Sequence, residues 1–237
     1  NSFLRSFVRS HFQTLTYQER CNFWAKYNEW FNVQLPNAVY HIPTDTMRCE
    51  AYNGLLLSKG LLLNSEIELK RLIDNSNDHQ AQQLYSQFIQ HKTQLAKLQT
   101  ESLSSEQCDS LSEVIYLEEK EVMLMLNEKF GDYTKRLNVT WNDVCRHLKT
   151  GEAAIEFIVS PLTTDSLVYS ALILKPGYDA PHLVPLFTEN QLKGISADQL
   201  YKSTAAGQLI WKPMSEELSG VHRIFFSPAG MLYSTGI

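Results

Sequence analysis

The sequence has no long run of basic residues and no long run of apolar ones. Its 21 Lys and Arg residues against 26 Asp and Glu residues give a formal net charge of −5, which is not the electrostatic pattern of a nucleic-acid-binding surface. The most apolar windows, Leu55–Leu57 and Leu61–Leu63, are separated by a Ser-Lys-Gly break, and neither approaches the ~20 apolar residues of a membrane span. We therefore expect neither a nucleic-acid partner nor a membrane span.

Cysteine is scarce and scattered, at Cys21, Cys49, Cys108 and Cys145, with no CxxC pair. This usage favours reduced thiols in a cytoplasmic protein. Cys145 and His147 are two residues apart on an expected helix, so their side chains diverge by about 200° and do not share a metal ion. The glycine-rich loops that hold phosphates, GxGxxG and GxxxxGK[ST], do not occur. The sequence therefore predicts no metal and no cofactor.

Motifs for covalent catalysis are missing as well. Ser58-Lys59 and Ser227-Pro-Ala-Gly230 match neither a GxSxG elbow nor an SxxK pair. Cys145 could face His182 or His222, but it follows Val144 on an inward helix face, whereas a reactive cysteine needs an exposed, electropositive setting. Both histidines are expected at strand ends. The sequence therefore predicts no catalytic residue in this chain.

Helical periodicity fills the first 148 residues. We found no tetratricopeptide pattern of about 34 residues in it. We expect a helix over Asn1–Phe12, a second that starts at a Thr16–Glu19 capping box and ends at Pro36, and a third over Met47–Ile73. Two further helices, around residues 81–98 and 111–133, are expected to form a hairpin joined by Thr100–Ser105. A short helix is expected to start at Thr140 and to be closed by Lys149–Gly151.

Three features inside these helices call for an interpretation. The aromatic stripe Phe23, Trp24, Tyr27, Trp30 and Phe31 is expected to pack against a neighbouring helix. Gly54 and Gly60, in an otherwise good helix, indicate close helix approach or a local break. Glu118, Glu119 and Glu121 could do acid–base chemistry only if burial separated their pKa values, and a solvated face is the expected environment.

The hydrophobic period changes at Lys149–Ile158, where strand sequence begins. Short connections favour an antiparallel meander, and a later strand reached through a helix could join the sheet as a buried parallel member. The expected elements are strands at Ala153–Val159, Leu167–Leu174, His182–Phe187 and Val221–Phe226, a loop at Ser160–Asp165, turns at Lys175–Asp179 and Ser227–Gly230, and a helical region from Ser196 to Trp211, interrupted near Gly207 and ended by Pro213.

Five segments resemble, in order and spacing, the opening of CHAT domains, which are caspase-like modules related to separase and gingipain peptidases and often follow tetratricopeptide repeats. These segments are Leu148–Phe157, Val168–Leu172, His182–Leu186, Leu209–Pro213 and Arg223–Leu232. Ala51–Asn64 and Asn138–Val144 are similar to the helical region that precedes CHAT domains in bacterial members. Nearly the whole chain is covered, and the order of the five segments carries the resemblance.

The resemblance implies an α+β protein, with an all-α helical region over residues 1–148 and an incomplete caspase-like α/β domain with a mixed sheet over residues 149–237. The family's catalytic His and Cys lie downstream of the turn that corresponds to Ser227–Gly230, where Ala229 stands in place of a frequent Asp. Neither His222 nor any of the four cysteines matches a family catalytic position. The chain does not begin with Met, and we expect it to be a non-catalytic piece of a CHAT-family cysteine peptidase.

The alternative is a protein–protein interaction scaffold or pseudo-peptidase with a partner-binding helical region. If Val221–Phe226 is a central strand of the complete domain, its unpaired apolar edge in this chain predicts a homo-oligomer or aggregation through that edge.

Overall fold

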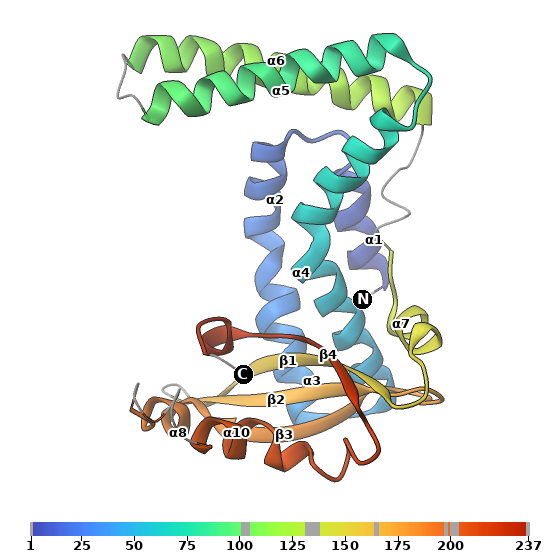
Figure 1. Cartoon of the computed structure of the whole chain (residues 1–237), viewed down its shortest axis with the longest axis vertical. Coiled ribbons are helices and arrows are strands. Elements are labelled where there is room, and N and C mark those ends of the chain that lie inside the picture. The colour runs from blue at the N-terminus through green and yellow to red at the C-terminus, as the bar shows by residue number, and fades with distance from the viewer. Residues whose placement is uncertain are drawn as a thin grey trace. The chain divides into compact units, whose positions relative to one another are not determined.

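The computed structural model of the chain describes residues 2–100, 105–130, 138–163, 166–196, 199 and 204–235. It shows an α+β protein with a helical N-terminal region and a four-stranded mixed sheet (Figure 1). The chain divides into two compact units, one of residues 1–26 and 60–138 and one of residues 27–59 and 139–237. The expected boundary at residue 148 marks where the strands begin. The compact unit that contains the sheet also includes residues 27–59, which come much earlier in the chain.

The first unit is built from helices. It contains α1 (Ser2–His11), α2 (Tyr17–Glu29) as far as Lys26, α4 (Asp45–Asp74) from Gly60, α5 (His79–Thr100) and α6 (Ser105–Phe130). Helices α5 and α6 run side by side as the expected hairpin (Figure 1); residues 101–104 of its link and Tyr133 lie outside the described residues. A core of α4 and α6 side chains joins this hairpin to α4, namely Leu69, Ile73, Val122, Met123 and Leu126.

Local sequence signals set the helix starts in this unit. The Thr16–Glu19 capping box is confirmed, because the Thr16 N–H donates to Glu19 Oε2 at 2.9 Å and the Glu19 N–H donates to Thr16 Oγ1 at 3.3 Å. At the start of α5, the Ala81 N–H donates to Asp78 Oδ1 at 3.0 Å, so Asp78 supplies the N-cap of that helix.

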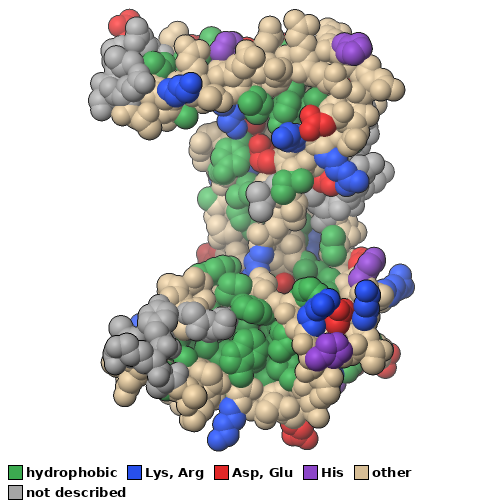
Figure 2. Space-filling view, viewed as in Figure 1, with side chains coloured by type: hydrophobic (Ala, Val, Ile, Leu, Met, Phe, Trp, Pro, Cys, Tyr) green, Lys and Arg blue, Asp and Glu red, His purple; other side chains and the backbone are tan. Residues whose placement is uncertain are grey.

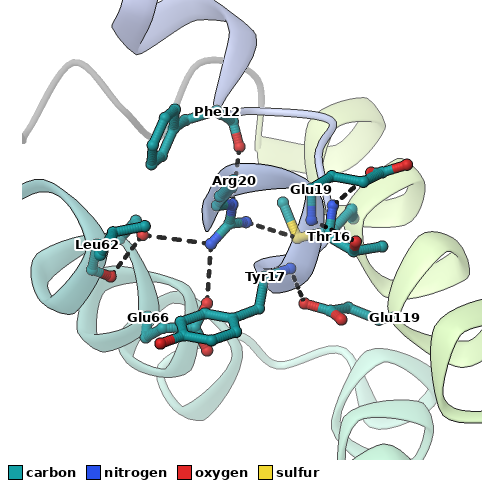
Figure 3. A network of polar contacts seen from close by, with 10 residues as sticks. Phe12, Thr16, Tyr17, Glu19, Arg20, Leu62, Glu66 and Glu119 are labelled. Carbon is teal, nitrogen blue, oxygen red and sulfur yellow. Dashed lines mark hydrogen bonds and ion pairs between the residues drawn. The ribbon is translucent and has the colours of Figure 1, made fainter. Parts of the chain in front are cut away.

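A fully buried arginine ties four segments of this unit together (Figure 3). Arg20 of α2 donates from Nε to the Phe12 carbonyl at 3.2 Å and from Nη1 to Glu66 Oε1 of α4 at 2.8 Å. Its Nη1 also lies 3.3 Å from Ser65 Oγ, and its Nη2 lies 3.0 Å from Met123 Sδ of α6. The planar guanidinium can reach all these acceptors at once because its donors diverge in a fixed fork.

We expected Glu118, Glu119 and Glu121 of α6 to lie on a solvated face, and this expectation is wrong for the first two. Glu118 Oε2 lies 2.8 Å from His91 Nδ1 of α5, and Glu119 Oε1 accepts the Tyr17 N–H at 2.6 Å. Burial is the main cause that raises the pKa of Glu119. Glu121 is exposed, as expected. The difference arises because α6 is covered by neighbouring helices on the side that carries Glu118 and Glu119.

The expected end of the second helix at Pro36 is also wrong. The chain stays helical through a π-helix, η1 (Trp30–Gln34), and then α3 (Leu35–His41), with Pro36 in the first turn of α3. A proline ring clashes with the carbonyl of the preceding helical turn, and the wider π turn before it relieves that clash.

Most of the aromatic stripe and Gly54 of α4 serve close packing, and Trp30 is the exception. Trp24 and Phe31 are buried, and the Phe23 ring stacks on His11 at 5.2 Å, whereas Trp30 is exposed. At Gly54 a Cβ would lie 2.9 Å from Leu35 Cδ1, so the close helix approach is confirmed there. Helix α4 runs through Gly54 and Gly60 without a break.

The second unit contains the sheet, with strands β1 (Glu152–Thr163), β2 (Ser166–Leu174), β3 (His182–Thr188) and β4 (Arg223–Ser227) in the order β3-β2-β1-β4. Strands β1, β2 and β3 form the expected antiparallel meander, and β4 is parallel to β1. The expected loop at Ser160–Asp165 is mostly strand, because Ser160 pairs with Val168 and Thr163 with Ser166 across an irregularity in register. Residues 164 and 165 lie outside the described residues.

The connection from β3 to β4 differs in detail from the expected helical region. Its first helix, α8 (Glu189–Lys193), starts at a Thr188–Gln191 capping box that was not among the expected features. Helix α10 (Ala205–Ile210) runs through Gly207 without interruption, and Pro213 lies inside a 3₁₀ turn, η3 (Lys212–Met214). Residues 197, 198 and 200–203 of the expected helix lie outside the described part of the chain.

The short helix α7 (Trp141–His147) precedes β1 and starts, as expected, at Thr140, which forms a capping box with Asp143. Its end is not the expected glycine cap, because the backbone is already extended at Leu148. Gly151 instead occupies a turn in which the Glu152 N–H donates to the Lys149 carbonyl at 2.9 Å, and its φ of +80° explains the glycine.

Helices cover both faces of the sheet. On one face α3, α7 and residues 45–59 of α4 contribute to a core that includes Val39, Tyr52, Leu55, Ile158 and Leu172. On the other face lie α8 and α10 (Figure 1), with η3 and the 3₁₀ turn η4 (Gly230–Tyr233), around Phe157, Tyr169, Ile210, Met214 and Leu232. Within the described residues, no helix combines the length and apolarity needed to cross a membrane.

Candidate functional site: the β4 edge and its buried lysine

Strand β4 forms one edge of the sheet, with β3 at the other, and pairs, within the described residues, with β1 alone. Its parallel orientation and its unpaired apolar edge are as expected, but the strand is not the buried member that it could have been, since Phe225 is 51% and Phe226 42% exposed. Successive residues of a strand point to opposite faces, so each face of the edge carries one exposed aromatic ring. Figure 2 shows hydrophobic side chains gathered on the surface of the unit that contains the sheet.

The surface continues differently on the two sides of β4. On the side of Phe225 there is a hollow of about 430 Å³, lined by residues of β1 and of the α7 region. Its apolar residues are Val139, Val144, Leu148 and Ala154, and its ionisable residues are Asp143, His147 and Glu152. On the side of Phe226 the ring meets Trp211 edge-on at 5.9 Å and Phe157 at 6.2 Å. Both sides of the edge therefore offer apolar surface to a neighbouring chain segment.

A buried ion pair lies at the carboxyl end of β4. Lys59 of α4 places Nζ 2.7 Å from Glu156 Oε2 of β1, and their side chains are only 18% and 9% exposed. The same Nζ donates to the main-chain carbonyls of Ser227, at 3.2 Å, and Phe157, at 3.3 Å. One ammonium group therefore joins α4 to two strands of the sheet, β1 and the last residue of β4.

The electrostatics of Lys59 arise from these contacts. Burial is the largest effect on its pKa and lowers it, while the Glu156 carboxylate acts in the opposite direction. An ammonium group has three protons, and Lys59 has three acceptors around Nζ. Loss of a proton would leave one acceptor without its donor, so the geometry favours a charged, structural lysine over a nucleophilic amine.

A cavity of about 620 Å³ adjoins Lys59 within the same unit. Its lining is mainly apolar, and several of its polar groups have hydrogen-bond partners: Ser58 Oγ donates to Asn32 Oδ1 at 2.9 Å, and the Tyr169 hydroxyl accepts the Met231 N–H at 2.9 Å. Such a cavity can accept an apolar side chain or a small neutral group.

The candidate residues for cysteine chemistry are engaged elsewhere. The Cys145 thiol is buried and donates to the carbonyls of Lys175, at 3.3 Å, and Tyr178, at 3.7 Å. His182 lies 3.0 Å from Glu217 Oε1 through Nδ1, and its ring stacks on Tyr178 at 4.1 Å. These contacts hold each side chain in a structural role.

The remaining candidates lie in similar settings. The His222 ring is so close to Gly151 that a Cβ there would lie 2.0 Å from Cε1. His147 Nδ1 lies 2.7 Å from the Asp143 carbonyl oxygen of its own helix. Within the described residues, no group of three or more His, Cys, Asp or Glu side chains could hold a metal ion.

Sequence reasoning missed the Lys59–Glu156 pair. Glu156 was visible as the single charge in the apolar segment Ala153–Val159, and such a charge needs a partner when it is buried. The partner lies 97 residues earlier, in a helix, and no local spacing connects the two.

Comparison of the chain with protein-family models, with curated proteins and with solved structures finds no match to any of them.

Proposed function

We propose that the unit containing the sheet carries the opening strands of a CHAT-type, caspase-like domain and that it acts in this chain by binding protein at the β4 edge, without peptidase activity. The observation that carries the proposal is the mixed sheet in the order β3-β2-β1-β4, with an apolar outer strand parallel to β1. The full protein then belongs to the CHAT cysteine peptidases, while this part of it works as a scaffold.

The elements support the resemblance in their order. Each of the five resembling segments falls on a separate part of the unit, with Leu148–Phe157 entering β1, Val168–Leu172 in β2 and His182–Leu186 in β3. Leu209–Pro213 ends α10 and begins η3, and Arg223–Leu232 covers β4 and most of η4.

The chemistry of the edge defines the partner. A segment that pairs with β4 must be apolar on both faces, because it would lie against Phe225 on one side and Phe226 on the other. Strand β4 of a second copy meets this requirement. In antiparallel pairing centred on Phe225, Arg223 of each copy lies opposite Ser227 of the other, which keeps the two like charges at opposite ends.

The predicted association is weak. A strand of five residues supplies a small interface, below the roughly 1,200 Å² at which stable complexes begin, so we expect a dissociation constant in the micromolar range or weaker. We further propose a cytoplasmic setting, supported by the four free cysteine thiols.

Self-association tests the edge. We expect the average mass by sedimentation equilibrium to rise with concentration in the wild type, and Phe225→Lys to remove that rise because it places a charge on the edge. Phe3→Lys, at an exposed aromatic residue of α1, is the matched control and should leave the rise unchanged. A wild type that stays monomeric at high concentration would contradict the proposal.

A peptidase assay tests the absence of catalysis. We expect the chain to cleave neither casein nor a peptide library, and Cys145→Ala to behave as the wild type does. Cleavage that iodoacetamide blocks and that Cys145→Ala abolishes would show that a cysteine of this chain is a nucleophile.

A further inference from the structure

We propose that Lys59 is the positioning residue of the β4 edge: its ammonium group holds the carboxyl end of β4 against β1 and α4, and so sets the surface on which a partner strand docks. This inference deepens the proposed function and rests on it for its biological meaning. The anchoring itself can be tested whether or not a partner binds.

Strand β4 has few other attachments to the sheet. It pairs with β1 over five residues, from Arg223 opposite Glu152 to Ser227 opposite Glu156, and within the described residues it has no strand on its other side. A short edge strand held on one side is prone to local opening. An additional bond to its main chain therefore has a large effect on its position.

The two ends of β4 are held differently. At its start, Arg223 Nη1 lies 3.3 Å from Glu152 Oε1, but the Arg223 side chain is mostly exposed, and exposed pairs contribute little. At its end, the bond from Lys59 Nζ to the Ser227 carbonyl lies beside a pair that is largely shielded from water. The start of β4 is also fixed through the main chain, because the His222 and Arg223 N–H groups donate to the Gly151 carbonyl at 2.8 and 3.2 Å. Its carboxyl end depends instead on a side chain that is shielded from water, Lys59.

The segment after Ser227 depends on the same anchor. Ser227 leads directly into the Pro-Ala-Gly segment and η4, where Gly230 has a φ of +54° and the Met231 N–H donates to the Tyr169 hydroxyl at 2.9 Å. Residues Ala229, Gly230 and Met231 line the 620 Å³ cavity together with Lys59. Lys59 thus positions both the strand edge and one wall of this cavity.

A pair of variants separates anchoring from stability. Lys59→Met alone leaves the buried Glu156 carboxylate without its partner, and it is expected to destabilise the whole unit. The double variant Lys59→Met/Glu156→Met replaces the pair by apolar side chains of similar size, a change that is often neutral or stabilising. Lys193→Met, which removes a surface pair with Glu189, is the matched control.

Hydrogen exchange measured by mass spectrometry on peptides that cover 223–231 is the readout, with peptides from β2 as the internal reference. In the double variant we expect exchange in 223–231 to rise at least tenfold while exchange in β2 stays within twofold of the wild type. The control should change neither region. Unchanged exchange in 223–231 in the double variant, with β2 also unchanged, would overturn the proposal.

The same variant links the anchor to the proposed function. If the wild type self-associates, the double variant should do so at least tenfold more weakly, although its β2 exchange shows an intact unit. If the wild type does not self-associate, the proposed docking fails, while the exchange experiment still decides whether Lys59 anchors β4. Full self-association in a double variant with a loosened β4 would refute the link between anchor and docking.

Discussion

Replacement of Arg20 by Met tests whether the buried guanidinium organises the first unit. The substitution keeps an unbranched side chain of similar length in a fully buried position but removes the donors to the Phe12 carbonyl and the Glu66 carboxylate. Breaking a buried ion pair from one side costs about 3–5 kcal/mol. Because the Glu66 side chain is 30% exposed and water can reach it, the lower end applies, about 3 kcal/mol.

Hydrogen exchange can measure this effect within one unit. A loss of about 3 kcal/mol corresponds to exchange more than a hundredfold faster for the protected amides of α6, since about 1.4 kcal/mol is a factor of ten. Amides of β2 in the other unit serve as the reference. Arg71→Met, which removes an exposed pair with Glu68, should change α6 exchange by less than about threefold.

An Arg20→Met variant whose α6 amides exchange less than tenfold faster would show that the guanidinium does not organise this unit. If that variant does not fold, Glu66→Gln supplies the milder test, because it removes the charge of the partner and leaves an oxygen acceptor for Arg20. We expect it to accelerate α6 exchange about tenfold, in the range of a weakened charged hydrogen bond.

Three further changes test other features. Glu119→Gln keeps an acceptor for the Tyr17 N–H. Because burial raises the pKa of the wild-type carboxyl, the stability of the wild type should fall as pH rises from about 4.5 through that raised pKa. Urea titrations of the variant should lack this fall and should show that it is more stable than the wild type at pH 7. Gly151→Ala should lower stability by about 2–4 kcal/mol, because φ is +80° and Cβ would meet the His222 ring, and His222→Ala should restore part of the loss in thermal unfolding. Gly54→Ala should lower stability by about 1–2 kcal/mol despite the better helix propensity of Ala, since its Cβ would lie 2.9 Å from a neighbouring side-chain carbon; a variant that melts at or above the wild-type temperature would contradict this.

Much of the secondary structure could be predicted because its signals are local. The 3.6-residue period identified the helices, and side-chain caps at Thr16 and Thr140 marked where two of them begin. Short connections and alternating apolar residues identified the meander, and the longer helical connection was compatible with a parallel β4. Each of these signals acts within a few residues of the chain.

Local signals failed where a neighbouring element changed the outcome. Pro36 lies within a helix because a π turn precedes it, and Gly207 does not interrupt α10. Glu118 and Glu119 were assigned to water, but their position on α6 coincides with the approach of His91 and Tyr17 from elsewhere in the unit. The burial of a side chain depends on what lies above it, and a single helix pattern does not contain that information.

Most helices and strands could be recognised from the sequence alone, which also placed Glu156, Phe225 and Phe226 on apolar strands. The strand order, the contacts of Arg20 with three other segments and the pairing of Lys59 with Glu156, 97 residues along the chain, follow from the tertiary fold. The physical reason is that backbone propensity and hydrophobic period are properties of neighbouring residues. Strand order and buried charge pairing depend on which distant segments exclude water from one another.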